Sequence, residues 1–127
     1  MTTILIVDDD PDIRESYQMV LEDVGYQARV AGNGQEALDL LRASAELPQL
    51  ILLDLSMPVM NGREFRAEQL RDQRLAQIPI IVLTAATTGE QQARLLQPHR
   101  VLPKPFSIET LLEAISSASL ELRSQPW

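Results

Sequence analysis

Several short apolar runs in the sequence end in residues whose side chains could do chemistry. Carboxylates follow two of these runs, a hydroxyl follows a third and a lysine follows the last: Asp8 with Asp9, Asp54, Thr84 and Lys104. Carboxylates brought close together repel one another unless a cation neutralises them or one of them takes up a proton. Mg²⁺ suits such a group, because it accepts one or two carboxylates, keeps bound water and leaves room for a phosphate.

Together these residue types equip a site for phosphoryl transfer. A metal ion and a lysine neutralise phosphoryl oxygens, a hydroxyl donates a hydrogen bond to one of them, and a carboxylate can attack phosphorus to form an acyl phosphate. Asp54 stands alone at the end of its run, which makes it the best candidate nucleophile. Asp8 and Asp9 are then left for the metal.

This chemistry requires a fold in which the ends of the runs meet. The runs Ile4–Val7, Leu50–Leu53 and Ile80–Leu83 are apolar at every position, which is typical of parallel strands covered by helices on both faces. Two weaker strand patterns, Gln27–Ala31 and Val101–Leu102, suit the edges of a sheet. The alternation of strands with helices predicts a doubly wound α/β fold with a parallel five-stranded sheet in the order 2-1-3-4-5. Its switch point, where ligands bind, lies between the first and third strands.

Helical patterns lie between and after the predicted strands. Asp10 followed by Pro11 is typical of a helix start, and Asn33 with Glu36 resembles a capping pair. A last helix is expected after Ser107. The positions expected to be buried are Ile13, Tyr17, Val20, Leu21 and Val24 in the first helix and Ile108, Leu111, Leu112, Ile115 and Leu122 in the last.

Length and composition narrow the class of protein. The 127 residues fit one domain, expected over 1–122 with a short tail at 123–127. The net charge of −7 argues against non-specific nucleic-acid binding, and no apolar run exceeds four residues. The absence of cysteine and the single histidine exclude disulfides, thiolate nucleophiles and multi-histidine metal sites. A cytoplasmic location is expected. The arginines near a third helix are expected to form a solvated face: Arg63, Arg66, Arg71 and Arg74.

Four segments, in order along the chain, carry a resemblance to a known family. They are Ile4–Asp10, Leu52–Pro58 with Gly62, Val82–Ala85 and Leu102–Phe106. Each is weak alone, but together and at this spacing they resemble the receiver domain of bacterial two-component response regulators, over residues 3 to about 122. The resemblance implies a flavodoxin-like (βα)5 fold and a stand-alone receiver similar to chemotaxis response regulators.

The resemblance also implies roles for the acidic residues. Asp54 would accept the phosphoryl group from a histidine kinase or a histidine phosphotransfer protein. Asp9, Asp54 and the main-chain carbonyl of Ser56 would bind Mg²⁺ directly, and Asp8 would act largely through water.

At the third and last segments, Thr84 and Lys104 would sense the phosphoryl group, and the bond between Lys104 and Pro105 would be cis. The sequence departs from the family at Val101, where a switching Tyr or Phe is usual, and at Gln97–Arg100, within a stretch that is about two residues shorter than usual by comparison with the family pattern. Val101 is stiff at χ1 and has no ring to rotate. We therefore expect the conformational switch to move Thr84 and the loop at 85–89, with little change at Val101.

Three functions remain open on these residues. The first is a stand-alone phosphoacceptor that phosphorylates itself, loses the phosphoryl group slowly and binds a downstream protein when phosphorylated. It would be a monomer or weak dimer, with no direct DNA or membrane binding, and not a turnover enzyme. The second is a phosphorylation-independent binding module, although such modules usually lose an acidic residue or the lysine. The third is a hydrolase of the haloacid dehalogenase type, which needs an acid where Ser56 stands.

Overall fold

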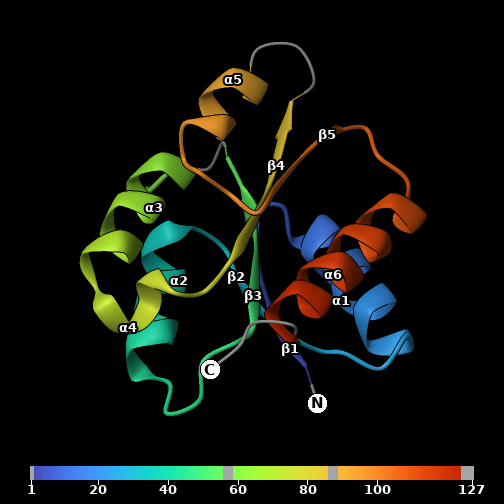
Figure 1. The fold of residues 1–127 in the computed structure, drawn as a ribbon, viewed down its shortest axis with the longest axis horizontal. Coiled ribbons are helices and arrows are strands. Elements are labelled where there is room, and N and C mark those ends of the chain that lie inside the picture. The colour runs from blue at the N-terminus through green and yellow to red at the C-terminus, as the bar shows by residue number, and fades with distance from the viewer. Residues whose placement is uncertain (1, 56–58, 86–88, 124–127) are drawn as a thin grey trace.

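The computed structural model describes residues 2–55, 59–85 and 89–123, and its centre is a parallel sheet. All neighbouring strands pair in parallel, and the order is β2-β1-β3-β4-β5, which confirms the predicted doubly wound fold (Figure 1). The strands are β1 (Thr3–Val7), β2 (Gln27–Ala31), β3 (Leu50–Asp54), β4 (Ile80–Ala85) and β5 (Arg100–Lys104).

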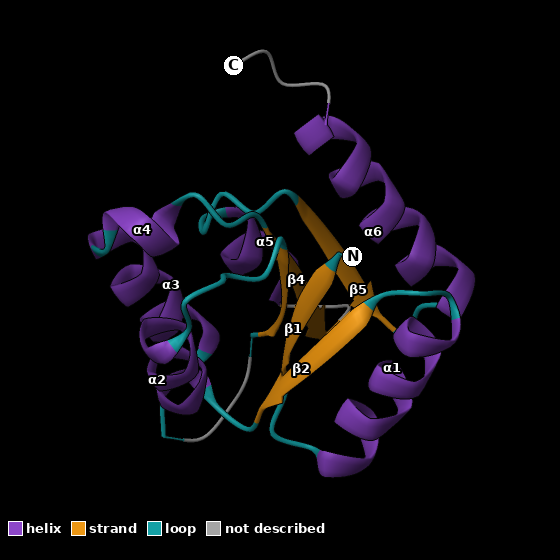
Figure 2. Ribbon diagram, turned by 90° about the horizontal axis from the view of Figure 1, so that it is seen from below, coloured by secondary structure: helices purple, strands orange, loops and turns teal. Residues whose placement is uncertain are grey.

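Helices cover both faces of the sheet. On one face lie α1 and α6, and on the other lie α2, α3, α4 and α5 (Figures 1 and 2). The helices are α1 (Pro11–Asp23), α2 (Gly34–Ala43), α3 (Gly62–Arg71), α4 (Gln73–Ala76), α5 (Gly89–Arg94) and α6 (Ile108–Arg123). Among the described residues, no helix is long and apolar enough to cross a membrane.

The three central strands are buried on both faces because their side chains alternate between two cores. Leu5 and Leu53 belong to the core under α2 and α3, together with Phe65. Ile6 and Leu52, their sequence neighbours, belong to the core under α1 and α6. This division explains why the sequence of these strands is apolar without a polar alternation.

The edge strand β2 has the predicted bounds, whereas the other edge strand, β5, is longer than the predicted Val101–Leu102. β5 runs from Arg100 to Lys104, and its register pairs Thr84 with Pro103 and Ala85 with Lys104. Pro103 has no N–H to donate, which an edge strand tolerates. Asp54 is the last residue of β3 and Thr84 is the last but one of β4, so both lie within their strands and not after them.

Polar side chains begin the helices as the sequence indicates. The Asp10 carboxylate accepts a hydrogen bond from the N–H of Asp12 at 2.9 Å, and the Asn33 side chain accepts one from the N–H of Glu36 at 2.9 Å. Asn61 and Glu64 form a reciprocal capping box at the start of α3, which the sequence analysis did not single out. These caps set the direction in which each chain segment leaves the sheet edge that carries Asp8 and Asp54.

Several predictions of burial are wrong. Val24 is 52 % exposed at the C-cap of α1, and Ile108 is 41 % exposed as the first residue of α6. Leu21, Leu111 and Ile115 are fully buried as predicted. The side chain of Leu122 and the tail at 124–127 lie outside the described residues.

The predicted solvated arginine face is also wrong in part. Arg63 and Arg71 are exposed, but Arg66 donates hydrogen bonds to main-chain carbonyls after α5. Arg74 is exposed as predicted, and it also donates to the carbonyls of Ser44 and Ala45 after α2. Both side chains point at the open ends of neighbouring helices, where carbonyls lack partners within the helix.

Candidate functional site

The three aspartates of the predicted site lie together at the carboxyl edge of the sheet. One carboxylate oxygen from each of Asp8, Asp9 and Asp54 lies within 4.8 Å of the others. β1 and β3 are neighbours with Val7 opposite Leu53, and this register brings the residues after Val7 beside Asp54. Asp8 is 1 % exposed and Asp54 7 %, whereas Asp9 is exposed.

Burial makes the charge on Asp8 costly. Desolvation raises the pKa of the Asp8 carboxyl above its ordinary value, and the nearby Asp9 and Asp10 add to this. A hydrogen bond of 3.0 Å from the N–H of Asp10 and the charge of Lys104 act in the opposite direction. The oxygen Oδ2 of Asp8 is buried with no hydrogen-bond partner, and Lys104 Nζ approaches it only to 4.0 Å. A buried carboxylate oxygen that accepts no hydrogen bond is suited to be a ligand of a cation.

Lys104 brings a positive charge to the same edge. Its Nζ lies 3.7 Å from Asp54 Oδ1, and its side chain remains 33 % exposed. Lys104 ends β5, and its long stem reaches across β4 to β3. The bond between Lys104 and Pro105 is cis, as the resemblance implied.

Thr84 completes the set at the end of β4. It is 2 % exposed, and the register places Leu83 opposite Asp54, so Thr84 lies at the same edge of the sheet. The structure thus brings together every predicted site residue that it describes. Ser56 and residues 86–88 of the predicted moving loop lie outside the described residues.

Two residues near the acidic group were not proposed for the site from sequence. Arg14 donates a hydrogen bond of 2.8 Å from Nη1 to the main-chain carbonyl of Asp8. Tyr17 has a raised pKa, first because of burial and then because of the negative charges of Asp8 and Asp54, and its ring stacks with Phe106 at 6.2 Å. Their position in the sequence could have indicated this proximity, because both residues lie in the first turns of the helix that follows the acidic run.

A glycine at the start of α3 allows a close approach to the end of β3. A Cβ at Gly62 would lie 2.9 Å from Leu55 Cα, closer than real Cβ atoms come, and 3.1 Å from the carbonyl oxygen of Asp54. The N–H of Gly62 donates to the carbonyl of Leu55 at 3.0 Å. Gly62 thereby lets the start of α3 pack against Leu55, the residue after the candidate nucleophile.

Comparison with known proteins agrees with this geometry. The sequence model of the response regulator receiver domain matches residues 4–116 of the chain. The chain belongs to this family. Receiver domains accept a phosphoryl group from histidine kinases in two-component signalling, and this receiver shares both the fold and the acidic edge.

Among curated relatives, the receiver is 40 % identical over 111 residues to the response regulator MprA of Mycolicibacterium vanbaalenii, covering 86 % of this chain and 46 % of that protein. It is 38 % identical over 116 residues to the response regulator Rre1 of Synechocystis, covering 89 % of this chain and 49 % of that protein. The chain therefore spans about half the length of these relatives.

Solved structures show the same fold. The chemotaxis response regulator CheY4 of Vibrio cholerae matches with a TM-score of 0.83 and 33 % identity, covering 93 % of this chain and 98 % of that one. The response regulator TrrA of Thermotoga maritima, solved in complex with Mg²⁺ and BeF, matches with a TM-score of 0.81 and 30 % identity, covering 93 % and 99 %.

Proposed function

We propose that this receiver accepts a phosphoryl group onto Asp54 in a Mg²⁺-dependent reaction and signals by binding a downstream protein when phosphorylated. The donor would be a histidine kinase or a histidine phosphotransfer protein. The observation that carries the proposal is the convergence of a buried carboxylate, two further carboxylates and one lysine at the ends of β1, β3 and β5.

The Asp54 carboxylate is the nucleophile. One of its oxygens attacks phosphorus, and the bond from phosphorus to the donor imidazole nitrogen breaks, with its electron pair going to that nitrogen. The product is an acyl phosphate on Asp54 and a free histidine on the donor. Lys104 Nζ, at 3.7 Å from Asp54, pairs with the new phosphoryl charge, and the Thr84 hydroxyl donates to a phosphoryl oxygen.

The residues at this edge suit Mg²⁺. Asp9 and Asp54 would hold it with the carbonyl of Ser56, and Asp8 would act largely through water. When bound, Mg²⁺ offsets the negative charge of the carboxylates and of the phosphoryl oxygens. The support from this chain is the clustering of the three carboxylates and the buried Oδ2 of Asp8, which has no hydrogen-bond partner.

The reaction we propose is a single transfer to the protein itself. Water slowly hydrolyses the acyl phosphate, which releases inorganic phosphate and restores Asp54. On this proposal the receiver is a signalling protein and not a turnover enzyme. Stand-alone organisation, a cytoplasmic location, a monomeric or weakly dimeric state and the absence of direct DNA binding stay predictions.

Phosphorylation by acetyl phosphate with Mg²⁺ tests the proposal. We expect one adduct per chain, labile to base and to hydroxylamine, that is absent in Asp54→Asn and strongly reduced in Asp9→Asn. Asp23→Asn is the matched control, because Asp23 is an exposed aspartate at the far end of α1. A stable adduct that survives Asp54→Asn would place the chemistry on another residue.

A further inference from the structure

A fully buried glutamine on α3 uses both donors of its amide nitrogen and also its amide oxygen. Gln69 is 0 % exposed, and its Nε2 donates to the carbonyls of Leu75 at 2.9 Å and Ile78 at 3.0 Å. Its Oε1 accepts a hydrogen bond of 2.8 Å from Nη1 of Arg66. Two carbonyls face the amide nitrogen, so the orientation of the amide is determined by its partners.

The arginine that completes this group reaches a different part of the chain. Arg66 Nε donates to the carbonyl of Leu96 at 3.0 Å, and Nη2 donates to the carbonyl of Gln97 at 3.2 Å. Burial lowers the pKa of Arg66, and no carboxylate among the described residues forms an ion pair with it. Within the described part of the chain, the acceptors of its half-buried guanidinium are three neutral oxygens.

Together Arg66 and Gln69 hold both ends of the segment that contains β4 and α5. Ile78 comes just before β4, and Leu96 and Gln97 come just after α5. Thr84, which is proposed to contact the phosphoryl group, lies between these two anchor points. The pair on α3 is thus placed to restrain the chain just before β4 and just after α5.

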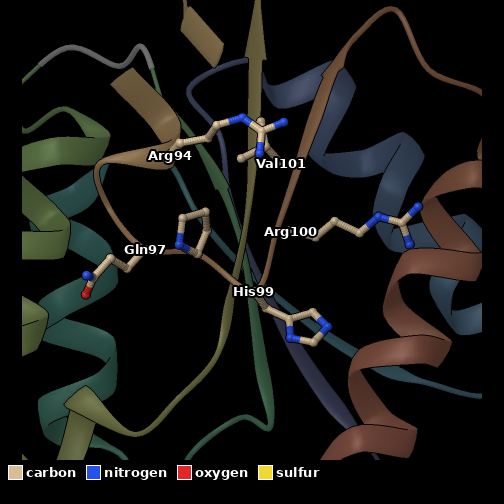
Figure 3. Close-up of a pocket in the computed structure, with 6 residues that line it drawn as sticks. Arg94, Gln97, His99, Arg100 and Val101 are labelled. Carbon is tan, nitrogen blue, oxygen red and sulfur yellow. The ribbon is translucent and has the colours of Figure 1, made fainter. Parts of the chain in front are cut away.

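The turn held by Arg66 forms one wall of a surface cavity. Gln97 has a φ of 53°, in the left-handed region that non-glycine residues seldom adopt. A cavity of about 420 Å³ is lined by Arg94, Gln97, Pro98, His99, Arg100 and Val101. Figure 3 shows Gln97 pointing toward the side of α3, while His99 and Arg100 point toward the side of α6.

We propose that Arg66 and Gln69 are an anchor that fixes the turn at Leu96–Gln97 to α3, so that phosphorylation of Asp54 leaves this wall of the cavity in place. The statement about phosphorylation rests on the proposed phosphoacceptor function. Arg66 and Gln69 are positioning residues, because neither touches the acidic site.

The contacts of the anchor depend on one another. If the turn moved away, Arg66 would lose two carbonyl partners while its charge stayed half-buried. If Arg66 followed the turn, Oε1 of the fully buried Gln69 would lose its partner. Leaving buried polar groups unsatisfied is costly, so the group is retained or lost as a whole. If a shift of Thr84 pulled on this turn, the hydrogen bonds of the anchor would oppose the displacement of the turn.

Amide hydrogen exchange of the unphosphorylated protein tests the anchor directly. The reporters are the N–H groups of Leu96 and Gln97, which bond to the carbonyls of Ala93 and Arg94, each at 3.1 Å. We expect Arg66→Leu to speed their exchange by at least about tenfold, through local opening of the turn. Arg63→Leu, at an exposed position of the same helix, is the matched control and leaves the rates within about twofold.

Arg66→Lys is a second variant in case Arg66→Leu folds poorly. Lysine keeps the charge but cannot bridge both carbonyls and Gln69, so the exchange of the same two amides is again faster. Rates in Arg66→Lys that match the Arg63→Leu control would overturn the anchor.

Binding of beryllofluoride with Mg²⁺ tests whether phosphorylation of Asp54 leaves the turn at Leu96–Gln97 in place. In the wild type we expect binding at Asp54 to change exchange near Thr84, and to change that of Leu96 and Gln97 by less than about twofold. In Arg66→Lys, the two turn amides become responsive to beryllofluoride. Large changes at this turn in the wild type would refute the inference. A complete lack of beryllofluoride binding would refute the proposed function, and the exchange rates without beryllofluoride would still decide the anchor.

Discussion

Lys104 Nζ lies 3.7 Å from Oδ1 of Asp54, although the two residues end strands that are separated by β4. The lysine charge also lies 4.0 Å from the buried Oδ2 of Asp8. Lys104 therefore partly offsets the repulsion of the acidic group before any phosphoryl group arrives, and it is already close to where that charge would appear.

Replacing Lys104 tests its role at the site. Lys104→Ala removes a cation that lies 3.7 Å from Asp54, so we expect affinity for beryllofluoride with Mg²⁺ to fall by about tenfold or more, equivalent to about 1.4 kcal/mol. Fluorine NMR of bound beryllofluoride measures this. Arg100→Ala, on the same strand, removes a positive charge away from the site and serves as the control. Equal losses in both variants would show a general charge effect.

Asp8 gives a pH dependence of stability with a definite sign. Burial raises the pKa of Asp8 in the folded protein above its value in the unfolded chain, so the ionised carboxylate opposes folding. This cost is fully present above the folded pKa and disappears below the unfolded value of 3.8. We expect Asp8→Asn, without Mg²⁺, to raise the free energy of unfolding at neutral pH by about 1 kcal/mol.

Urea unfolding at several pH values checks the prediction for Asp8→Asn. The gain should shrink as the pH falls through the folded pKa of Asp8 toward the ordinary range of an aspartate. Asp23→Asn is the control, because Asp23 is an exposed aspartate at the far end of α1 and its charge is away from the acidic group. A gain that grows on acidification would contradict the assigned sign.

Val59 carries backbone strain at the surface. Its φ is 67°, so a β-branched residue occupies the left-handed region. Its side chain is 80 % exposed, so burial of apolar surface does not offset this strain. We expect Val59→Asn to stabilise the protein by about 1 kcal/mol, because asparagine tolerates this conformation. Thermal and urea unfolding measure the gain. Val24→Asn, at an exposed valine with a φ of −97°, should give none.

Substitutions of Thr84 and Val101 are expected to affect the conformational switch to different extents. Thr84 is buried at the acidic edge, whereas Val101 is half-buried and packs against the core under α2 and α3. We expect Val101→Ala to change affinity for the downstream partner by less than about tenfold, or about 1.4 kcal/mol, and Thr84→Ala to cost more. Calorimetry with and without beryllofluoride compares them. Loss of phosphorylation dependence in Val101→Ala alone would show that Val101 carries the switch.

The sequence determined the sheet and the acidic edge. Strands buried on both faces must be apolar throughout, so Ile4–Val7 and Leu50–Leu53 could be identified as central strands. Parallel strands end at a common edge, and the position of Asp8, Asp54 and Thr84 at strand ends was enough to bring them together. These are local patterns combined with one topological rule.

The tertiary structure decided which polar side chains outside the acidic edge are structural. Arg63 and Arg66 look alike in the sequence of one helix, but only Arg66 faces the turn after α5 and finds carbonyl partners there. Gln69 carries no sequence signal of full burial, because its partners lie in segments that only the packed fold brings to it. Local sequence sets where a helix begins and which stripe is apolar, whereas the hydrogen-bond partners of a buried polar group depend on long-range packing.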